Sequence, residues 1–441
     1  MNRSRSEDGT GAVPESTYQK WSARSDQMAS VIRRKQRIDR FVDLARVYRG
    51  WNKSETFEAL GRESGKVTPE SGNPKLDLVA RLADALDWGI GDVAESVWQA
   101  EPVGDEESAR PFAELDQEAQ SLHRMGEYQK LLSVAARMRK CARSSMERAI
   151  VANRLAGAYD GLGRYVRTLA CVQEGLAESA LPRDLRLMLL VNLANAHYSL
   201  WNLHEARAIA GDILDRFEHF APMGRLQRVA RAFARSVRGN AQRRLLWNAD
   251  EPFEFSVDVA STDLRRAQRE YESLALEFGD SQYQAIANTC RGAILELDAA
   301  AGRLDEETAI SEILGALDQV VDVEAFPKGD LLESWGWWSI YGCNVALRSA
   351  NTAAFGRELA ILTNKAAEIA DRLDNWAMRE RAFTMEHFRR ERASEDGLGE
   401  EPMTLDPDDI RVLAGAMGRF PLFRPTGWAI LERAGALTAE V

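Results

Sequence analysis

Apolar residues recur at helical spacing along most of the chain. Between Met28 and Tyr48 they form one stripe, opposite a run of arginine and lysine residues. Shorter stripes with the same spacing occupy residues 54–60, 76–88 and 90–98, and almost everything after residue 111 follows the pattern. Apolar positions three and four residues apart indicate amphipathic helices. The pattern therefore predicts an all-α protein.

Changes in composition divide the chain into four parts. Residues 1–27 are polar and charged, which predicts a flexible tail because they have too little apolar surface to bury. Residues 28–100 are expected to form a small helical domain. The charged stretch EPVGDEESARP at 101–111 contains two prolines and indicates a linker. Residues 112–441 are expected to form a second domain made of helix pairs.

The second domain has an internal period. Gly126, Gly163, Trp201 and Gly239 are spaced by 37, 38 and 38 residues. Each is expected to mark a tight turn between two helices, with small residues in the first helix and an aromatic residue near its end. A single helix pair cannot bury its apolar face, whereas stacked pairs can. The period therefore predicts an α-solenoid.

These units resemble the tetratricopeptide repeat, a helix-turn-helix unit of about 34 residues. The match is best at 151–182 and 189–220. The spacing is slightly longer than in that family, and Trp201 replaces the usual turn glycine. Divergent repeats and an unrelated α-solenoid both fit the pattern.

The first domain carries a series of helix-start and turn signals. Ser54 can cap the second helix, Gly72 can supply a left-handed turn, and Pro74 can stand near a helix start. With Leu60-Gly61, Glu70-Ser71-Gly72 and the apolar helix 76–88, segment 41–98 resembles the Cro/CI-like helix-turn-helix domain. The resemblance implies a five-helix fold that places one helix in the major groove of DNA.

The segment that should form this reading helix is short. Between Gly61 and Glu70 stand only RESGKVTP. Glycine in a helix interior costs about 1 kcal/mol and proline about 3 kcal/mol, so two or three helical turns are not expected here. A DNA-binding domain and a retained fold reused for docking or dimerisation both remain open.

The candidate DNA contacts follow from this resemblance and from the basic run in the first helix. They are Arg62, Ser64, Lys66 and Thr68 in the reading segment, Asn52 and Lys53 on the DNA backbone, and Arg33, Arg34 and Lys35 on phosphate. A solvated helix face is the alternative interpretation of the basic run.

Charge restricts where nucleic acid could bind. The net charge of −11 excludes broad nucleic-acid coating, which requires a basic surface. Residues 1–50, however, carry 11 lysines and arginines against six acidic residues, a net charge of +5. Any contact with DNA is therefore expected at the N-terminal end.

The remaining composition indicates a cytoplasmic protein. The four cysteines stand far apart without a C-x-x-C pair, which predicts free, buried thiols rather than a metal knuckle or disulfides. No apolar run reaches the roughly 18 residues needed to span a membrane, and the N-terminus lacks the apolar core of a secretory signal.

No catalytic constellation stands out, so the sequence predicts a non-enzymatic protein without metal or cofactor. His204-Glu205 lacks the second histidine of a zinc-protease motif, and neither a phosphate-binding loop nor a G-x-S-x-G motif occurs.

Two further groups are candidates for a groove that binds a peptide or a partner. Arg231, Arg235 and Arg238 lie in an arginine-rich helix and could hold an acidic peptide, although such arginines also pair with acidic residues of neighbouring helices. Trp335, Trp338 and Tyr341 share one side of a helix and could anchor a partner or belong to the core.

Taken together, these features predict a bacterial transcriptional regulator. The resemblance implies a DNA-binding N-terminal domain ahead of a helical repeat domain that forms a homodimer and senses a peptide or protein effector. The alternative is a non-enzymatic interaction scaffold whose degenerate N-terminal domain docks protein rather than DNA.

Overall fold

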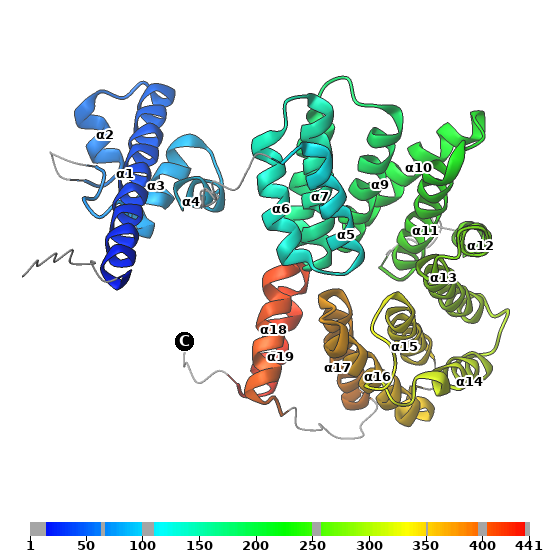
Figure 1. Cartoon of the computed structure of the whole chain (residues 1–441). Coiled ribbons are helices and arrows are strands. Elements are labelled where there is room, and N and C mark those ends of the chain that lie inside the picture. The colour runs from blue at the N-terminus through cyan, green and yellow to red at the C-terminus, as the bar shows by residue number, and fades with distance from the viewer. Residues whose placement is uncertain are drawn as a thin grey trace, which may run out of the picture. The chain divides into compact units, whose positions relative to one another are not determined.

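The computed structural model describes residues 15–62, 67–98, 110–248, 257–349, 352–395 and 404–436. Within these residues the chain forms nineteen α-helices and three short 3-10 helices, with no strand (Figure 1). The prediction of an all-α protein is thus confirmed. The chain divides into two compact units, Met1–Glu106 and Glu107–Val441.

The smaller unit contains α1 (Glu15–Arg49), α2 (Lys53–Ala59), α3 (Leu76–Leu86) and α4 (Ile90–Trp98). Helix α1 begins at Glu15, so residues 15–27, which composition placed in a flexible tail, are helical. Neither glycine nor proline occurs between Glu15 and Arg49, so nothing interrupts the helix there. Residues 1–14 lie outside the described part of the chain.

The core of the smaller unit joins its helices through buried aliphatic side chains: Ile38, Leu60, Leu78, Leu82 and Val93. The end of α1 is fastened to the end of α3 by polar contacts. Arg49 Nε donates to the carbonyl of Ala85 at 2.6 Å, and Tyr48 Oη donates to Asp87 at 2.7 Å. The bond from Arg49 satisfies a carbonyl that the end of a helix leaves without a partner.

Helix α2 begins two residues earlier than it would if Ser54 were its cap. The cap is Asn52, whose side chain accepts from the N–H of Glu55 at 3.0 Å while Glu55 accepts from the N–H of Asn52 at 2.7 Å. Asn52 lies directly before the first helical residue, where only its side chain reaches the free N–H groups.

The chain after α2 forms turns rather than a helix in the residues that are described. Gly61 has φ +63° and Gly72 has φ +68°, and residues 67–75 are not helical. Gly72 is therefore left-handed as expected, but it closes a turn and ends no helix. The described part of this unit has four helices instead of five, and residues 63–66 are not described.

The larger unit is a succession of antiparallel helices. They are α5 (Phe112–Arg124), α6 (Tyr128–Cys141), α7 (Ser145–Gly161), α8 (Tyr165–Ala177), α9 (Arg183–Ser199), α10 (Leu203–His219), α11 (Gly224–Asn248), α12 (Val257–Phe278), α13 (Ser281–Ala300), α14 (Glu306–Leu317), α15 (Asp330–Arg348), α16 (Gly356–Leu373), α17 (Trp376–Glu395), α18 (Pro407–Arg419) and α19 (Arg424–Arg433). Neighbouring helices in this order pack on one another (Figure 1), consistent with an α-solenoid.

Three of the four predicted turn positions are turns. Gly126, Gly163 and Trp201 have φ of +72°, +65° and +65° and end α5, α7 and α9. The prediction at Gly239 is wrong. That residue lies inside α11, where an added Cβ would stand 2.8 Å from Leu264 Cγ. Glycine is used there for close packing of α11 on α12.

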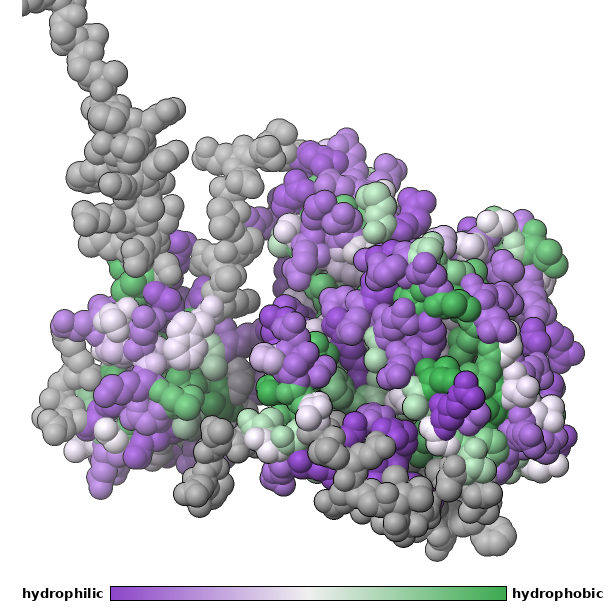
Figure 2. Space-filling view, turned by 90° about the horizontal axis from the view of Figure 1, so that it is seen from below, coloured by the Kyte–Doolittle hydropathy of each residue, from purple (hydrophilic) through white to green (hydrophobic). Residues whose placement is uncertain are grey.

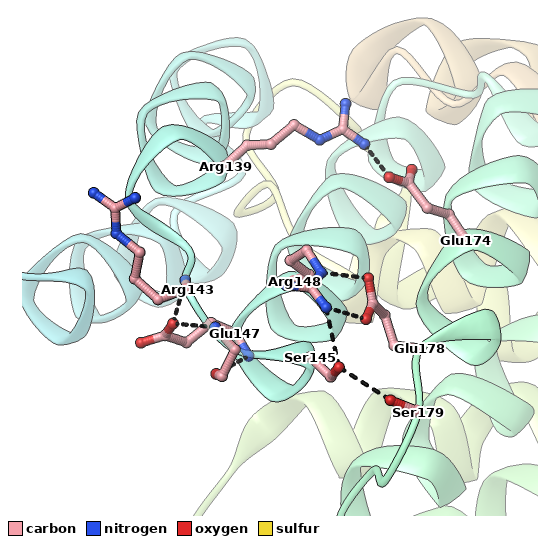
Figure 3. A network of polar contacts seen from close by, with 9 residues as sticks. Arg139, Arg143, Ser145, Glu147, Arg148, Glu174, Glu178 and Ser179 are labelled. Carbon is pink, nitrogen blue, oxygen red and sulfur yellow. Dashed lines mark hydrogen bonds and ion pairs between the residues drawn. The ribbon is translucent and has the colours of Figure 1, made fainter.

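Polar contacts repeat between successive helix pairs (Figure 3). Arg148 donates two hydrogen bonds, at 2.6 and 2.7 Å, to Glu178, and Arg139 pairs with Glu174. Solvent reaches these side chains, so the pairs add little to stability. Their main consequence is to fix how α8 is placed on α6 and α7.

The helices of the larger unit close into a ring (Figure 1). Tyr165, at the start of α8, packs on Phe420 with ring centroids 5.4 Å apart. An apolar cluster joins Tyr165 to buried residues of α18 and α19. Next to it, Trp376 at the start of α17 covers Gly163 so closely that an added Cβ would lie 2.9 Å from Trp376 Cβ. The two ends of the helix succession thus meet.

Alanine at Gly163 is expected to lower the free energy of unfolding by about 2 kcal/mol, because it combines a left-handed conformation with a clash against Trp376. Alanine at Gly126 is the matched control. It has the same conformation and no atom within 4 Å of an added Cβ, so only about 1 kcal/mol is expected. Urea unfolding of both variants measures the difference, and equal losses would show that the ring closure adds nothing.

Hydrophilic side chains cover most of the face shown in Figure 2. None of the helices in the described residues is both long and apolar enough to cross a membrane. The ring encloses two cavities, which form the candidate site.

Candidate functional site

Two adjoining cavities, of about 570 and 270 Å³, lie inside the ring of the larger unit. Their walls come from α7, α9, α11, α13, α15 and α17, the helices that face the ring centre. Five residues belong to both walls: Trp201, Arg244, Trp337, Tyr341 and Arg381. We refer to the two cavities together as the chamber.

Trp201 is held in an unusual conformation at this shared wall. Its φ of +65° is left-handed, which costs a residue with a Cβ about 1–2 kcal/mol. The indole ring lies between two guanidinium groups, with Arg244 at 4.3 Å and Arg381 at 4.4 Å from the ring centroid. Cation–π contacts of this kind offset part of the strain. Strained residues gather at functional sites, and this one faces the chamber.

Arg244 is held by rings instead of by an acid. Its guanidinium lies 4.0 Å from the centroid of the Tyr198 ring, and Nη1 donates a long hydrogen bond of 3.4 Å to the carbonyl of Tyr198. No described carboxylate pairs with Arg244, and burial lowers its pKa below the usual value. A guanidinium in this state has donors available to an anion.

Arg243, the preceding residue, belongs to a closed ionic cluster. Glu296 is fully buried and accepts from Arg243 at 2.5 Å, from Arg348 at 2.6 Å and from Asn344 at 3.1 Å. Burial alone would raise the pKa of Glu296, but the two guanidinium groups hold it below the usual value. Burial lowers the pKa of Arg348 to about 10, although Glu296 opposes this shift. The cluster fixes α11, α13 and α15 to one another.

The smaller cavity has carboxylates on another part of its wall. Asp160 Oδ1 is buried and has no hydrogen-bond partner. Burial and the carboxylate of Glu333 raise the pKa of Asp160 to about 7. Glu333 accepts from Trp337 Nε1 at 3.2 Å and from Asn375 at 2.9 Å, and burial raises its pKa as well. Neither acid has a cationic partner in the described part of the chain.

The arginines of α11 that the sequence proposed for a groove pair with acidic residues of α12. Arg231 and Arg235 both pair with Glu270, the former at 2.9 Å. Arg238 donates two hydrogen bonds, at 2.7 and 2.8 Å, to the buried Asp263. The alternative interpretation, pairing with a neighbouring helix, describes these arginines.

The aromatic candidates divide between core and chamber. Trp335 and Trp338 are buried and pack edge to face with centroids 5.2 Å apart, and Trp338 Nε1 donates to the carbonyl of Asn288 at 2.8 Å. Tyr341 alone of the three lines the chamber. The two tryptophans therefore stabilise the packing of α15, and the six proposed groove residues do not form one surface.

Several candidate DNA contacts of the smaller unit are engaged within the unit. Asn52 caps α2. Arg62 pairs with Asp77 at 3.4 Å, and the hydroxyl of Thr68 donates to Asp39. All three lie at positions where solvent still reaches them.

The remaining candidate DNA contacts are on α1, at the start of α2 or outside the described residues. Lys53 is exposed at the start of α2, and Arg33 is exposed on α1, where Arg34 and Lys35 are half-buried. Ser64 and Lys66 lie outside the described residues.

Apart from Tyr341, the sequence analysis did not predict the residues of the chamber, and one partial signal was present. Trp201 occupies a turn position where Gly126 and Gly163 stand in the other units, so a bulky residue replaces glycine where φ is positive. Asp160 and Glu333 carry no motif, because their neighbours come from distant helices.

A scan against models of protein families and a search of curated proteins both gave no match for this chain. Among the described residues, no group of three or more His, Cys, Asp or Glu side chains could hold a metal ion. Cys290 and Cys343 are buried, Cys141 and Cys171 are half-buried, and none of the four is in a disulfide.

Proposed function

We propose that this protein is a non-enzymatic, ligand-responsive regulator. In this proposal the helical ring binds an effector in its chamber, and the smaller unit binds DNA as a Cro/CI-like domain. The observation that carries the proposal is the chamber, where Asp160 and Arg244 are half-buried, the Oδ1 atom of Asp160 has no hydrogen-bond partner, and no described ion pair neutralises either side chain. Unpaired charge inside a protein costs stability, and perturbed titratable groups gather at functional sites.

The support for DNA binding comes from the smaller unit. The residues that resemble the helix-turn-helix family lie in α2, the turns around Gly61 and Gly72, and α3. The net charge of +5 in residues 1–50 favours contact with phosphate. Lys53 stands exposed at the start of α2 and is the clearest candidate for such a contact.

The full-length protein is therefore expected to bind mixed-sequence duplex DNA with an affinity that falls steeply between 50 and 200 mM salt. Lys53→Ala should weaken binding similarly for all sequences and lower the salt slope by about 1. Lys328→Ala, which removes an exposed lysine from the larger unit, is the control and should change neither. Fluorescence anisotropy across the salt series measures both quantities.

The second candidate function is a scaffold whose smaller unit docks protein. It is favoured by the internal pairing of Arg62 with Asp77 and of Thr68 with Asp39, which engages side chains that would otherwise face DNA. Full-length protein that binds no duplex at any salt concentration in the series would decide for this alternative.

A further inference from the structure

The smaller cavity offers an unsatisfied site for a cation. Asp160 Oδ1 is a buried acceptor without a donor, and Glu333, close enough to shift its titration, uses one oxygen for Trp337 and Asn375. Asp330 lines the same cavity and, like these two, has no ion pair among the described residues. Asp160 and Glu333 are half-buried and Asp330 is exposed. Carboxylates that are partly withdrawn from water are stabilised when a cation pairs with them, so an ammonium group has a place here.

The same cavity offers a site for an anion on another part of its wall. Arg244 lines it and is oriented by stacking on Tyr198 and Trp201. Its only described hydrogen bond is the long one to a backbone carbonyl. Guanidinium groups bind carboxylates through paired N–H groups, which makes the planar orientation of Arg244 suitable for a carboxylate.

The smaller cavity has little room and a partly aromatic wall. The cavity that holds both Asp160 and Arg244 measures about 270 Å³ and also has Trp337 and Tyr341 in its wall. Cavities of about 300–1,000 Å³ hold small organic ligands, and aromatic walls suit an apolar side chain. The second cavity, of about 570 Å³, continues beyond Arg244 and gives room for a longer ligand.

We propose that the chamber binds a small zwitterion, an amino acid or a short peptide with free ends. Its ammonium group pairs with Asp160 and Glu333, and its carboxylate pairs with Arg244. This inference rests on the proposed sensing role of the ring and adds to it the chemical class of the ligand and its direction in the chamber. Both charged ends are required, because each one relieves a different unpaired group of the protein.

The test is isothermal titration of the full-length protein at pH 8 with two pools, the twenty amino acids and a random tripeptide mixture. Each pool is used in three forms: free, N-acetylated and C-amidated. At least one free pool is expected to bind, and blocking either end should weaken that binding at least about tenfold, since either block removes one charged contact. The pool that binds identifies the size of the ligand.

Two variants assign the ends. Asp160→Asn should reduce the penalty for N-acetylation but leave the penalty for amidation unchanged, since Glu333 remains. Arg244→Gln should remove the penalty for amidation and leave the penalty for N-acetylation unchanged. Asp212→Asn, at an exposed position of α10, should behave as the unmodified protein. Equal binding of free and blocked forms, or no heat from either free pool, would overturn the inference. The readout does not involve DNA, so loss of the proposed DNA binding leaves this result unaffected.

Discussion

Replacing Glu296 by glutamine is expected to lower the free energy of unfolding of the larger unit by about 3–5 kcal/mol. The side chain is fully buried and accepts from Arg243 at 2.5 Å and from Arg348 at 2.6 Å. The amide of glutamine cannot balance the charge of Arg243, whose side chain is only 4% exposed. The loss is large because it leaves buried charge without a counter-ion. Urea unfolding followed by circular dichroism measures it.

A matched control separates burial from pairing. Glu312 pairs with Arg291 at 3.2 Å, and both side chains are exposed. Glu312→Gln removes the same chemical group from a surface pair and should change the free energy of unfolding by no more than about 1 kcal/mol. A similar, small effect for both variants would contradict the view that the Glu296 cluster holds α11, α13 and α15 together.

The second large effect concerns Asp160. Its pKa rises from an ordinary 3.8 to about 7 in the folded protein, so between these values the folded state binds the proton more tightly than the unfolded state does. Stability from this group is therefore full at low pH and is lost as pH rises toward 7. The corresponding free energy is about 4 kcal/mol. Asp160→Asn should abolish this loss.

The variant is expected to be more stable than the unmodified protein by about 4 kcal/mol at pH 8, with the advantage shrinking toward pH 5. Unfolding midpoints at both pH values test this, and Asp212→Asn is the control because its carboxylate is exposed. The amide of asparagine changes the free energy of unfolding by an amount that does not depend on pH. The test is therefore the slope of that free energy against pH. Parallel pH profiles for the unmodified protein and Asp160→Asn would contradict the prediction.

Local features of the fold were predictable because they depend on neighbouring residues. Apolar spacing gave the all-α class, and the glycines at 126 and 163 gave two of the turns. At Gly239 the same reasoning failed, since a glycine that permits close helix packing looks identical in sequence to one in a turn. The cap of α2 was misplaced by two residues because Asn52 and Ser54 can both cap helices.

The chamber was not predictable because it depends on contacts between distant segments. Tyr165 and Phe420 meet although 255 positions separate them. The arginines of α11 show the same limit. Arg238 and Arg244 lie on one helix, yet one is neutralised by Asp263 and the other has no described acidic partner. The difference arises because α12 places Asp263 beside Arg238, whereas Arg244 lies against the rings of Tyr198 and Trp201.

The closure at Tyr165 and Phe420 changes how the array should lose its structure. In an open array of repeats, each unit depends only on its neighbours, and unfolding begins by fraying at a terminal unit. Here the seam ties α8 to α18, so the units between them have no free end from which to fray. The contact between α8 and α18 must break before any of these units can unfold separately. Unfolding of the ring should consequently be more abrupt than that of an open array of the same length.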